Sequence, residues 1–457
     1  MAGLRIFAFQ NVISTHVAQF FSKPSAQVSE IMLAHNSLPW TLRTAKRTFC
    51  TSLRCSSSSF PSVTGASATK VFCQEISCGV RSCNRNLFVR WSRLYSQIPQ
   101  QELKPLDKNR KARHQKLMLL TYLSGFIGVC LLGAIGAQQY KRMARKAKGI
   151  EDLKIREYGR RPYLFRYRGF IFPQFVVDDV KSIHQFEIRE DDLWIVSYPK
   201  AGTTWLQELV YLIDTNLDFE GAEKNTMDDR FPFFEFPYPG KKAINDLPSP
   251  RRIKTHLPFP LLPNQMKEKK PKIIYIARNP KDTLVSLYHF AVKFFAPVQR
   301  FQGTYDQFCE LFAEDKAIYG PWWKHVLEAW KCRDDDNVLV LFYEDLQKDL
   351  PGVVRQVASF LGKSLTDAEV DAVAKHCTFE SMKNNKSVNY DWLKEQGMAS
   401  DKADFMRKGK VGDWKNHLSS EISAKLEEMV SSKLTPAGVV FQDTLEGSYG
   451  QDEDDML

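Results

Sequence analysis

The sequence predicts an α/β fold for the larger, C-terminal part of the chain, because short apolar runs alternate with segments of helical periodicity. The run 192–197 contains β-branched and aromatic residues, and the apolar residues after position 205 recur at helical spacing. The run 272–277 has the same character and precedes the helical pattern of 283–290. A third such run covers 337–342. We expect these runs to be buried strands of one α/β body.

Length and charge set the organisation around this body. The chain has 457 residues, which corresponds to two or three domains, and its 43% apolar content is enough to bury a core. The net charge of +11 is uneven: residues 1–148 carry 22 basic and four acidic residues, whereas 149–457 carry 42 and 49. The excess positive charge therefore indicates targeting and membrane-flanking segments, and we expect no nucleic-acid partner. An acidic tail, 443–457, ends the chain.

The N-terminal arm, residues 1–100, holds 11 basic residues, two acids and a run of four serines, 56–59. This composition is typical of a mitochondrial transit peptide. It is equally typical of a disordered extension, so both interpretations stay open. If the protein is targeted to a membrane, the composition favours a mitochondrial membrane over membranes of the secretory pathway.

Residues 117–137 form an uncharged, apolar stretch of 21 residues. A helix needs about 20 such residues to cross a bilayer core. Basic residues flank the stretch on both sides, and the second flank opens a basic linker, 138–166. We expect a single transmembrane anchor rather than a buried core helix, because the basic flanks would have to emerge at a core boundary. With positive charge on both sides, the orientation stays open.

The turn after the first strand carries the pattern of a phosphate cradle. Lys200 and Gly202 precede Thr203 and Thr204, which begin the helical segment. A helix N-terminus offers unpaired N–H groups, glycine allows close approach of the backbone, and threonine hydroxyls donate hydrogen bonds. The lysine precedes the glycine, so this is not a Walker A loop. Taken alone, the turn is also compatible with a well-capped strand–helix connection.

Further along the chain, three segments offer groups for anion binding and proton transfer. Arg278 ends the second strand, and Ser286 lies on the helix after it, so both can reach a second phosphate. His256 is a candidate general base near neutral pH, although a single histidine is more often structural. Arg407 and Lys408 open a basic, glycine-containing loop that could clamp an anion or form a solvated turn.

Together, these segments resemble the cytosolic sulfotransferase family over residues 167–442. The matching motifs, in the order of the family, are YPKAGTTW (198–205), KTHLP (254–258), ARNPKDTLVS (277–286) and RKGKVGDWKN (407–416). The resemblance implies a P-loop-like α/β domain with a parallel central sheet flanked by helices. It also implies 3′-phosphoadenosine-5′-phosphosulfate (PAPS) as the sulfuryl donor, without a metal.

The resemblance assigns donor-binding roles to individual residues. The 5′-phosphosulfate would be bound by Lys200, Ala201, Gly202, Thr203, Thr204 and Trp205. The 3′-phosphate would be bound by Arg278, Ser286, Arg407, Lys408 and Gly409. The adenosine would be contacted by Tyr343, Cys377, Thr378 and Met382. Cys377 stands where the family usually has threonine.

The resemblance also implies a mechanism and an acceptor site. His256 would be the general base, Lys254 would assist at the sulfuryl oxygens, and Lys200 would neutralise charge on the leaving oxygen. The acceptor site would be formed by Phe233, Phe236, Lys254, His256 and Phe290. These aromatic side chains favour an apolar small molecule that bears a hydroxyl or an amine.

Two other functions remain as alternatives to a membrane-anchored sulfotransferase. A catalytically inactive, nucleotide-binding membrane scaffold would share the fold, but it would be expected to lose one of Lys200, Lys254, His256 or Ser286. A lumenal carbohydrate sulfotransferase shares the phosphate-binding loops, but the three distant cysteines of the body fit a reducing compartment better. Outside mitochondria, we expect a single-pass protein with its catalytic domain facing the cytosol.

The expected assembly state depends on one short segment that begins at the end of the basic loop 407–416. Many members of the family dimerise through KxxxTVxxxE. In this chain Lys415 is followed by Ser419 and Ser420 at the Thr-Val positions and by Ala424 at the glutamate position. Loss of the branched apolar side chain and of the charge removes much of a small interface, so we expect a monomer or a weak dimer.

Overall fold

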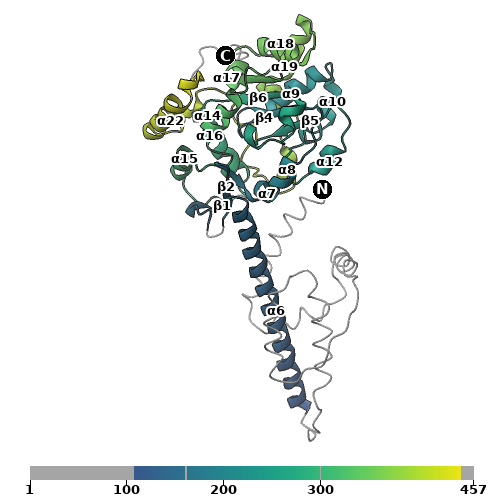
Figure 1. Ribbon diagram of the computed structural model, residues 1–457, viewed down its shortest axis with the longest axis vertical. Helices are drawn as coiled ribbons and strands as arrows, with labels where there is room; N and C mark the ends of the chain where they lie inside the picture. Colours follow the sequence, from purple (N-terminus) through teal and green to yellow (C-terminus); the bar gives the residue numbers. More distant parts are fainter. Residues whose placement is uncertain (1–107, 160–161, 299, 444–457) are drawn as a thin grey trace. The chain divides into compact units, whose positions relative to one another are not determined.

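The computed structural model describes residues 108–159, 162–298 and 300–443 (Figure 1). The predicted arm, 1–100, and residues 444–457 of the acidic tail lie outside the described residues. The chain divides near residue 135 into two units, and the body from Gly136 onward is described first.

The body is built on a parallel sheet of four strands in the order β5-β4-β6-β7. The strands are β4 (Leu193–Ser197), β5 (Arg252–Thr255), β6 (Lys272–Ala277) and β7 (Val338–Phe342). Strands β4 and β6 lie at the centre and are buried on both faces, apart from the first residue of β6. This explains their continuous apolar sequences. The predicted parallel sheet and the three predicted strands are confirmed, with the first and third beginning one residue later than expected.

A helix follows each of the three predicted strands. They are α9 (Thr203–Asp214), α14 (Pro280–Tyr288) and α17 (Tyr343–Lys348). Helix α14 begins three residues before the predicted start, because Asn279 caps it with its side chain and Pro280 occupies its first position. Beyond Tyr288 the helix continues as a π-helical segment, η3 (His289–Phe294).

The other helical elements surround this core. They are η1 (Arg156–Tyr158), α7 (Gln174–Asp178), α8 (Val180–His184), α10 (Phe219–Lys224), α11 (Met227–Arg230), α12 (Lys241–Asn245), η2 (Phe259–Leu261), α13 (Met266–Lys269), α15 (Tyr305–Ala313), α16 (Trp322–Trp330), α18 (Leu350–Leu361), α19 (Asp367–His376), α20 (Phe379–Asn384), α21 (Asp391–Glu395), η4 (Asp413–Asn416), α22 (Ser420–Lys433) and η5 (Thr435–Ala437).

Two hydrophobic cores lie on opposite faces of the parallel sheet. Trp194 and Val196 of β4 belong to one core, together with residues of α16 and α22. Leu193 and Ile195 belong to the other, together with residues of α9, α18 and α19. Successive side chains of a strand point to opposite faces, so this alternation shows that helices cover the sheet on both sides. Figure 1 shows the sheet at the centre of the body with helices around it.

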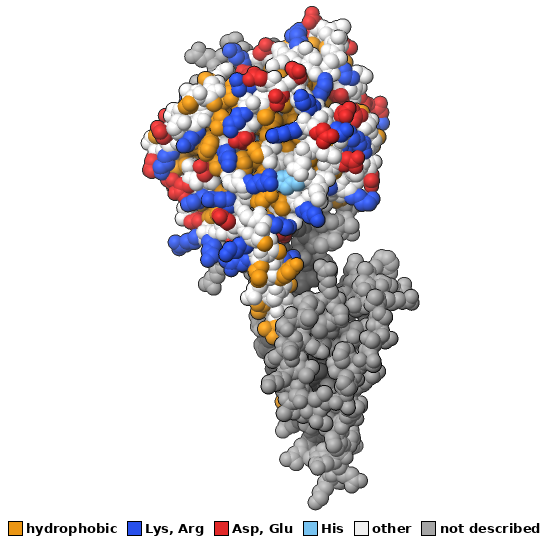
Figure 2. Space-filling model, in the orientation of Figure 1, with side chains coloured by type: hydrophobic (Ala, Val, Ile, Leu, Met, Phe, Trp, Pro, Cys, Tyr) orange, Lys and Arg blue, Asp and Glu red, His pale blue; other side chains and the backbone are white. Residues whose placement is uncertain are grey.

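A second, antiparallel sheet precedes the parallel one. It consists of β1 (Ile150–Leu153), β2 (Leu164–Tyr167) and β3 (Phe170–Pro173) in that order. Strand β1 and most of β2 fall within the segment predicted as a basic linker, 138–166. On the surface of the body, basic and acidic side chains are interspersed over the face drawn in Figure 2.

The predicted membrane span, 117–137, lies within one long helix, α6 (Lys108–Ala147). Within 117–137, six side chains lie outside the described set: Tyr122, Leu123, Phe126, Ile127, Val129 and Leu131. Over the part of the chain that is described, none of the helices combines the length and the apolar character required to cross a bilayer.

Candidate active site

The predicted site residues meet at one edge of the parallel sheet. Tyr198 follows β4, His256 follows β5, Arg278 follows β6 and Tyr343 follows β7. All four strands are parallel, so their carboxyl ends lie side by side. The chain passes from β4 to β5 on one side and then to β6 on the other. Ligands of open α/β sheets bind outside the carboxyl ends near such a reversal.

The turn between β4 and α9 has an unusual backbone. Lys200 has φ +71° and Gly202 has φ +100°, both in the left-handed region. A Cβ at Gly202 would lie 2.7 Å from the Tyr343 ring, so this position requires glycine. Among the described residues, no side chain caps the start of α9. The N–H groups of its first turn, at Thr203, Thr204 and Trp205, are therefore available to an anion.

Lys200 lies among aromatic rings and other cations. Its Nζ is 4.4 Å from the ring centre of Phe290 and 4.1 Å from that of Phe405. Burial, and after it the positive charges of Arg278, Lys254 and Arg407, lower the pKa of the Lys200 ammonium to about 7. The ion pairs found among the described residues do not include Lys200. A doubly charged anion would relieve this repulsion, so the residues present fit a phosphosulfate group.

His256 is held by the end of β4. Its Nδ1 lies 2.9 Å from the Ser197 carbonyl oxygen and 3.3 Å from the Ser197 hydroxyl, which is 2.7 Å from the Thr203 hydroxyl. A carbonyl oxygen can only accept, so Nδ1 carries the hydrogen. Burial, and then the charge of Lys254, lower the pKa of His256 well below its usual value. The ring is therefore neutral, and its Nε2 has a lone pair that can take a proton.

Glu235 orients this histidine and has no counterpart among the residues assigned from sequence. Its carboxylate is buried and accepts hydrogen bonds from the Thr255 hydroxyl (2.7 Å) and the His256 N–H (2.8 Å). The preceding residues pair with β5, since the Phe234 N–H donates to the Lys254 carbonyl over 2.8 Å. In the sequence, Glu235 is the charged residue of the otherwise apolar segment 231–236, and this could have indicated a functional role.

The predicted acceptor residues fall into two groups. Phe233 and Phe236 stack in parallel, with ring centres 5.7 Å apart, and the Phe233 ring lies 5.1 Å from the His256 ring. Lys254 Nζ lies 4.6 Å from the centre of the Phe233 ring. Phe290 contacts Lys200 instead. The aromatic residues therefore flank both groups to which catalytic roles were assigned.

The residues expected at the 3′-phosphate come from two segments. The Arg278 guanidinium lies 4.1 Å from the Tyr343 ring centre and donates to the Lys410 carbonyl over 3.1 Å. Its buried Nε has no hydrogen-bond partner in the described part of the chain. Ser286 is half-buried on α14. An anion at this position would satisfy the Arg278 donor.

In the closing loop, 407–416, two cationic side chains form ion pairs with an acidic residue of the same loop. Arg407 and Lys408 pair with Asp413 over 2.6 Å and 2.7 Å. The loop is attached to α14, because the N–H groups of Gly412 and Trp414 donate to the Asp282 carboxylate over 2.8 Å and 3.0 Å. Gly409 has φ +67°, and a Cβ there would overlap the Phe379 ring. Asp282 was also missed from sequence, since its partners lie 130 residues away.

The residues expected at the adenine form a third cluster. The Trp205 indole N–H donates to the Cys377 carbonyl over 2.7 Å, and its ring meets Tyr343 edge-on at 5.4 Å. The Cys377 side chain is fully buried. Thr378 caps α20, and Met382 is buried. Cys377 thus contacts Trp205 of the predicted donor-binding segment through its backbone carbonyl rather than through its thiol.

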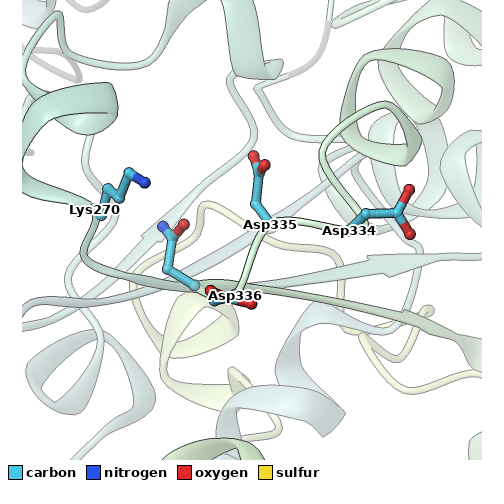
Figure 3. A pocket seen from close by; sticks show the side chains of 5 residues that line it. Lys270, Asp334, Asp335 and Asp336 are labelled. Atoms are coloured by element: carbon cyan, nitrogen blue, oxygen red, sulfur yellow. The ribbon is translucent and has the colours of Figure 1, made fainter.

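The pocket drawn in Figure 3 lies elsewhere. Lys270 lies on one side of it and Asp334 and Asp335 on the other, at the amino ends of β6 and β7. The amino ends of the strands lie at the opposite side of the sheet from the carboxyl ends, where His256 is found. Within the described ranges, no group of three or more His, Cys, Asp and Glu side chains is arranged to hold a metal ion.

Comparison with known proteins agrees with this geometry. The sulfotransferase domain family matches residues 190–438. The chain belongs to the sulfotransferase family. Sulfotransferase 1C2 of Oryctolagus cuniculus is 37% identical to this sulfotransferase over 287 residues, which cover 62% of this chain and 96% of that protein. Luciferin sulfotransferase of Photinus pyralis is 39% identical over 288 residues, which cover 57% of this chain and 76% of that protein.

A solved structure agrees in fold. Retinol dehydratase in complex with androsterone and the inactive cofactor PAP matches this sulfotransferase with a TM-score of 0.59 and 29% identity, covering 65% of this chain and 98% of that chain. The predicted activity and donor are thereby confirmed: the chain is an enzyme that transfers a sulfuryl group from PAPS to a hydroxyl or amine of a small molecule.

Proposed function

We propose that His256 is the general base of this sulfotransferase and that Lys200 stabilises the leaving group. Nε2 of His256 removes the acceptor proton while the acceptor oxygen, or nitrogen, forms a bond to sulfur. The bond between sulfur and the phosphate oxygen breaks, and its electron pair stays on the nucleotide. The ammonium of Lys200 then faces the oxygen that becomes negative. PAPS supplies the activated sulfuryl group; the protein supplies position and charge.

The same geometry supports the remaining assignments. We assign the first turn of α9 to the 5′-phosphosulfate, together with Lys200 through Trp205. Arg278, Ser286 and the 407–409 segment bind the 3′-phosphate, and Lys254 assists at the sulfuryl oxygens. Phe233, Phe236 and Phe290 surround an apolar acceptor. Tyr343, Cys377, Thr378 and Met382 lie at the adenosine.

One observation carries the catalytic assignment: a neutral imidazole, oriented by Ser197, lies within the field of Lys254 and Lys200. The test incubates the full chain with radiolabelled PAPS and a panel of phenols, alcohols and amines. Labelled product with the wild type, and none with His256→Ala, supports the proposal. Nucleotide binding without product on any acceptor would favour the inactive scaffold instead.

We also propose that residues 117–137 anchor the enzyme to a membrane, with the mitochondrial membrane as first choice. The support is the uncharged sequence and five exposed apolar side chains: Leu117, Leu119, Leu120, Leu132 and Ile135. The full chain should resist carbonate extraction, and a chain lacking 1–148 should not. Recovery of the full chain in the soluble fraction would refute the anchor. A fluorescent reporter fused to residues 1–100 tests the compartment.

For assembly, we propose a monomer or a weak dimer. Ser419 caps α22 through the Ile422 N–H, and Ser420 is the first residue of that helix, so both positions serve the helix start. Neither supplies the branched apolar contact of the dimerisation segment of the family. Sedimentation of residues 149–457 at sub-micromolar concentration should give the monomer mass, and a tight dimer would contradict this.

A further inference from the structure

Asp228 is an acid beside the acceptor site to which the mechanism gives no role. It lies on α11, half-buried, and its Oδ1 accepts a hydrogen bond from the Tyr390 hydroxyl over 3.1 Å. No described residue donates a hydrogen bond to its Oδ2. Ion pairs within 4 Å, among the described residues, do not include Asp228 either. One oxygen of this carboxylate is therefore open to a ligand.

Asp228 is linked to the surroundings of His256 by charge and to Lys200 by direct contacts. Burial raises the pKa of the Asp228 carboxyl, and the positive charge of Lys254 opposes that shift. Lys254 Nζ lies 4.6 Å from the Phe233 ring centre, and that ring lies 5.1 Å from His256. The first path, from Asp228 towards the base, is thus electrostatic in its first step.

The second path runs through Tyr390. The Tyr390 ring centre lies 4.5 Å from that of Phe405, and the Lys200 Nζ lies 4.1 Å from the Phe405 ring centre. Asp228 is therefore connected to Lys200 by a chain of contacting side chains. The other side chains of this chain of contacts, Tyr390, Phe405 and Lys200, are aromatic or cationic, so Asp228 is its acidic member.

We propose that Asp228 binds a cationic amine carried by the acceptor, at some distance from the hydroxyl that receives the sulfuryl group. This rests on the proposed acceptor site around Phe233 and His256. A carboxylate in apolar surroundings gains most from a partner of opposite charge that also donates a hydrogen bond. The anionic donor compensates Lys200 and Lys254 when it binds, which leaves Asp228 to pair with the acceptor. The ammonium has no lone pair, so sulfur is transferred to oxygen only.

The test compares two acceptors of the same skeleton, tyramine and 4-ethylphenol, with the full chain and radiolabelled PAPS. The wild type should prefer tyramine by about tenfold or more in kcat/KM, mainly through KM, because a charge-assisted hydrogen bond is gained. Asp228→Asn should lower kcat/KM for tyramine by about 10- to 100-fold, and that for 4-ethylphenol by no more than about threefold.

Two variants serve as controls. Asp229→Asn changes the exposed neighbour, which accepts from Thr226, and should leave the ratio of the two acceptors unchanged. Tyr390→Phe removes the partner of Oδ1 but keeps the carboxylate, and should keep the preference for tyramine.

Each outcome decides the proposal. A wild type that sulfates both acceptors equally overturns it, whether or not the variants fold. Equal losses on both acceptors in Asp228→Asn would show a structural role and also overturn it. If the wild type sulfates neither acceptor, the proposed acceptor site fails and the inference fails with it.

Discussion

The Nδ1 atom of His256 lies 2.9 Å from the carbonyl oxygen of Ser197, the last residue of β4. The contact joins the ends of two adjacent parallel strands, since His256 follows β5. It fixes the hydrogen on Nδ1 and directs the lone pair of Nε2 away from the strand. The sheet itself therefore sets the tautomer of the base.

His256→Ala should abolish turnover and leave donor affinity nearly unchanged. The expected loss is about 10²- to 10⁴-fold, the usual contribution of one positioned acid–base group. Single-turnover rates measure the chemical step, and titration calorimetry with the desulfated nucleotide measures donor affinity. His184→Ala, on α8 outside the site, is the matched control. Near-normal turnover in His256→Ala would rule out this assignment.

Arg278→Ala should act on binding rather than on chemistry. Removing the guanidinium leaves a phosphate charge underpaired, so nucleotide affinity should fall by about 1.5–3 kcal/mol. Calorimetry with the desulfated nucleotide reads this directly. Arg252→Ala is the control, because that guanidinium pairs with Asp214 at the start of β5. Equal losses in both variants would indicate a general charge effect instead.

The central strands were predictable because β4 and β6 are buried on both faces and so have continuous apolar sequences. Strand β5 was not identified, since it lies at the sheet edge and its residues alternate between buried and half-buried. Its RIKT sequence gives no apolar run. The motif residues around β4 were predictable because they are consecutive in the chain.

Residues that act through distant partners could not be found in the same way. Glu235 receives its hydrogen bonds from Thr255 and His256, about 20 residues later. Asp282 holds a loop that lies 130 residues away. Asp228 has no motif at all and is brought to the site by Tyr390, 162 positions along the chain. Such pairs depend on the folded topology.

Asp192→Ala should strongly destabilise the fold. Asp192 precedes β4 and accepts two hydrogen bonds from Arg251, which precedes β5, over 2.7 Å and 2.6 Å. Both side chains are fully buried, so the variant would leave a buried guanidinium unpaired. We expect a loss of about 3–5 kcal/mol in the free energy of unfolding, measured with denaturant. Asp246→Ala, which breaks an exposed pair with Lys242, should cost less than about 0.5 kcal/mol.

Nucleotide binding should take up a proton at pH 8, and Lys200 should be the group that receives it. In the unliganded enzyme, burial lowers the pKa of Lys200 from 10.5 to about 7, and the nearby cations contribute. Most of the population is then neutral at pH 8. A bound anion restores the ammonium, so binding should take up about one proton at pH 8 and almost none below pH 6.

The uptake is measured by calorimetry in buffers of different ionisation enthalpy, with the desulfated nucleotide as ligand. Lys200→Met removes the titrating group and should abolish the uptake at pH 8. The same shift predicts a pH dependence of stability in the unliganded wild type. Between about pH 7 and 10.5 the unfolded chain holds a proton on Lys200 that the folded enzyme has released, so the free energy of unfolding rises with pH. Equal proton uptake in Lys200→Met and the wild type would assign the proton to another group, with His256 next in line.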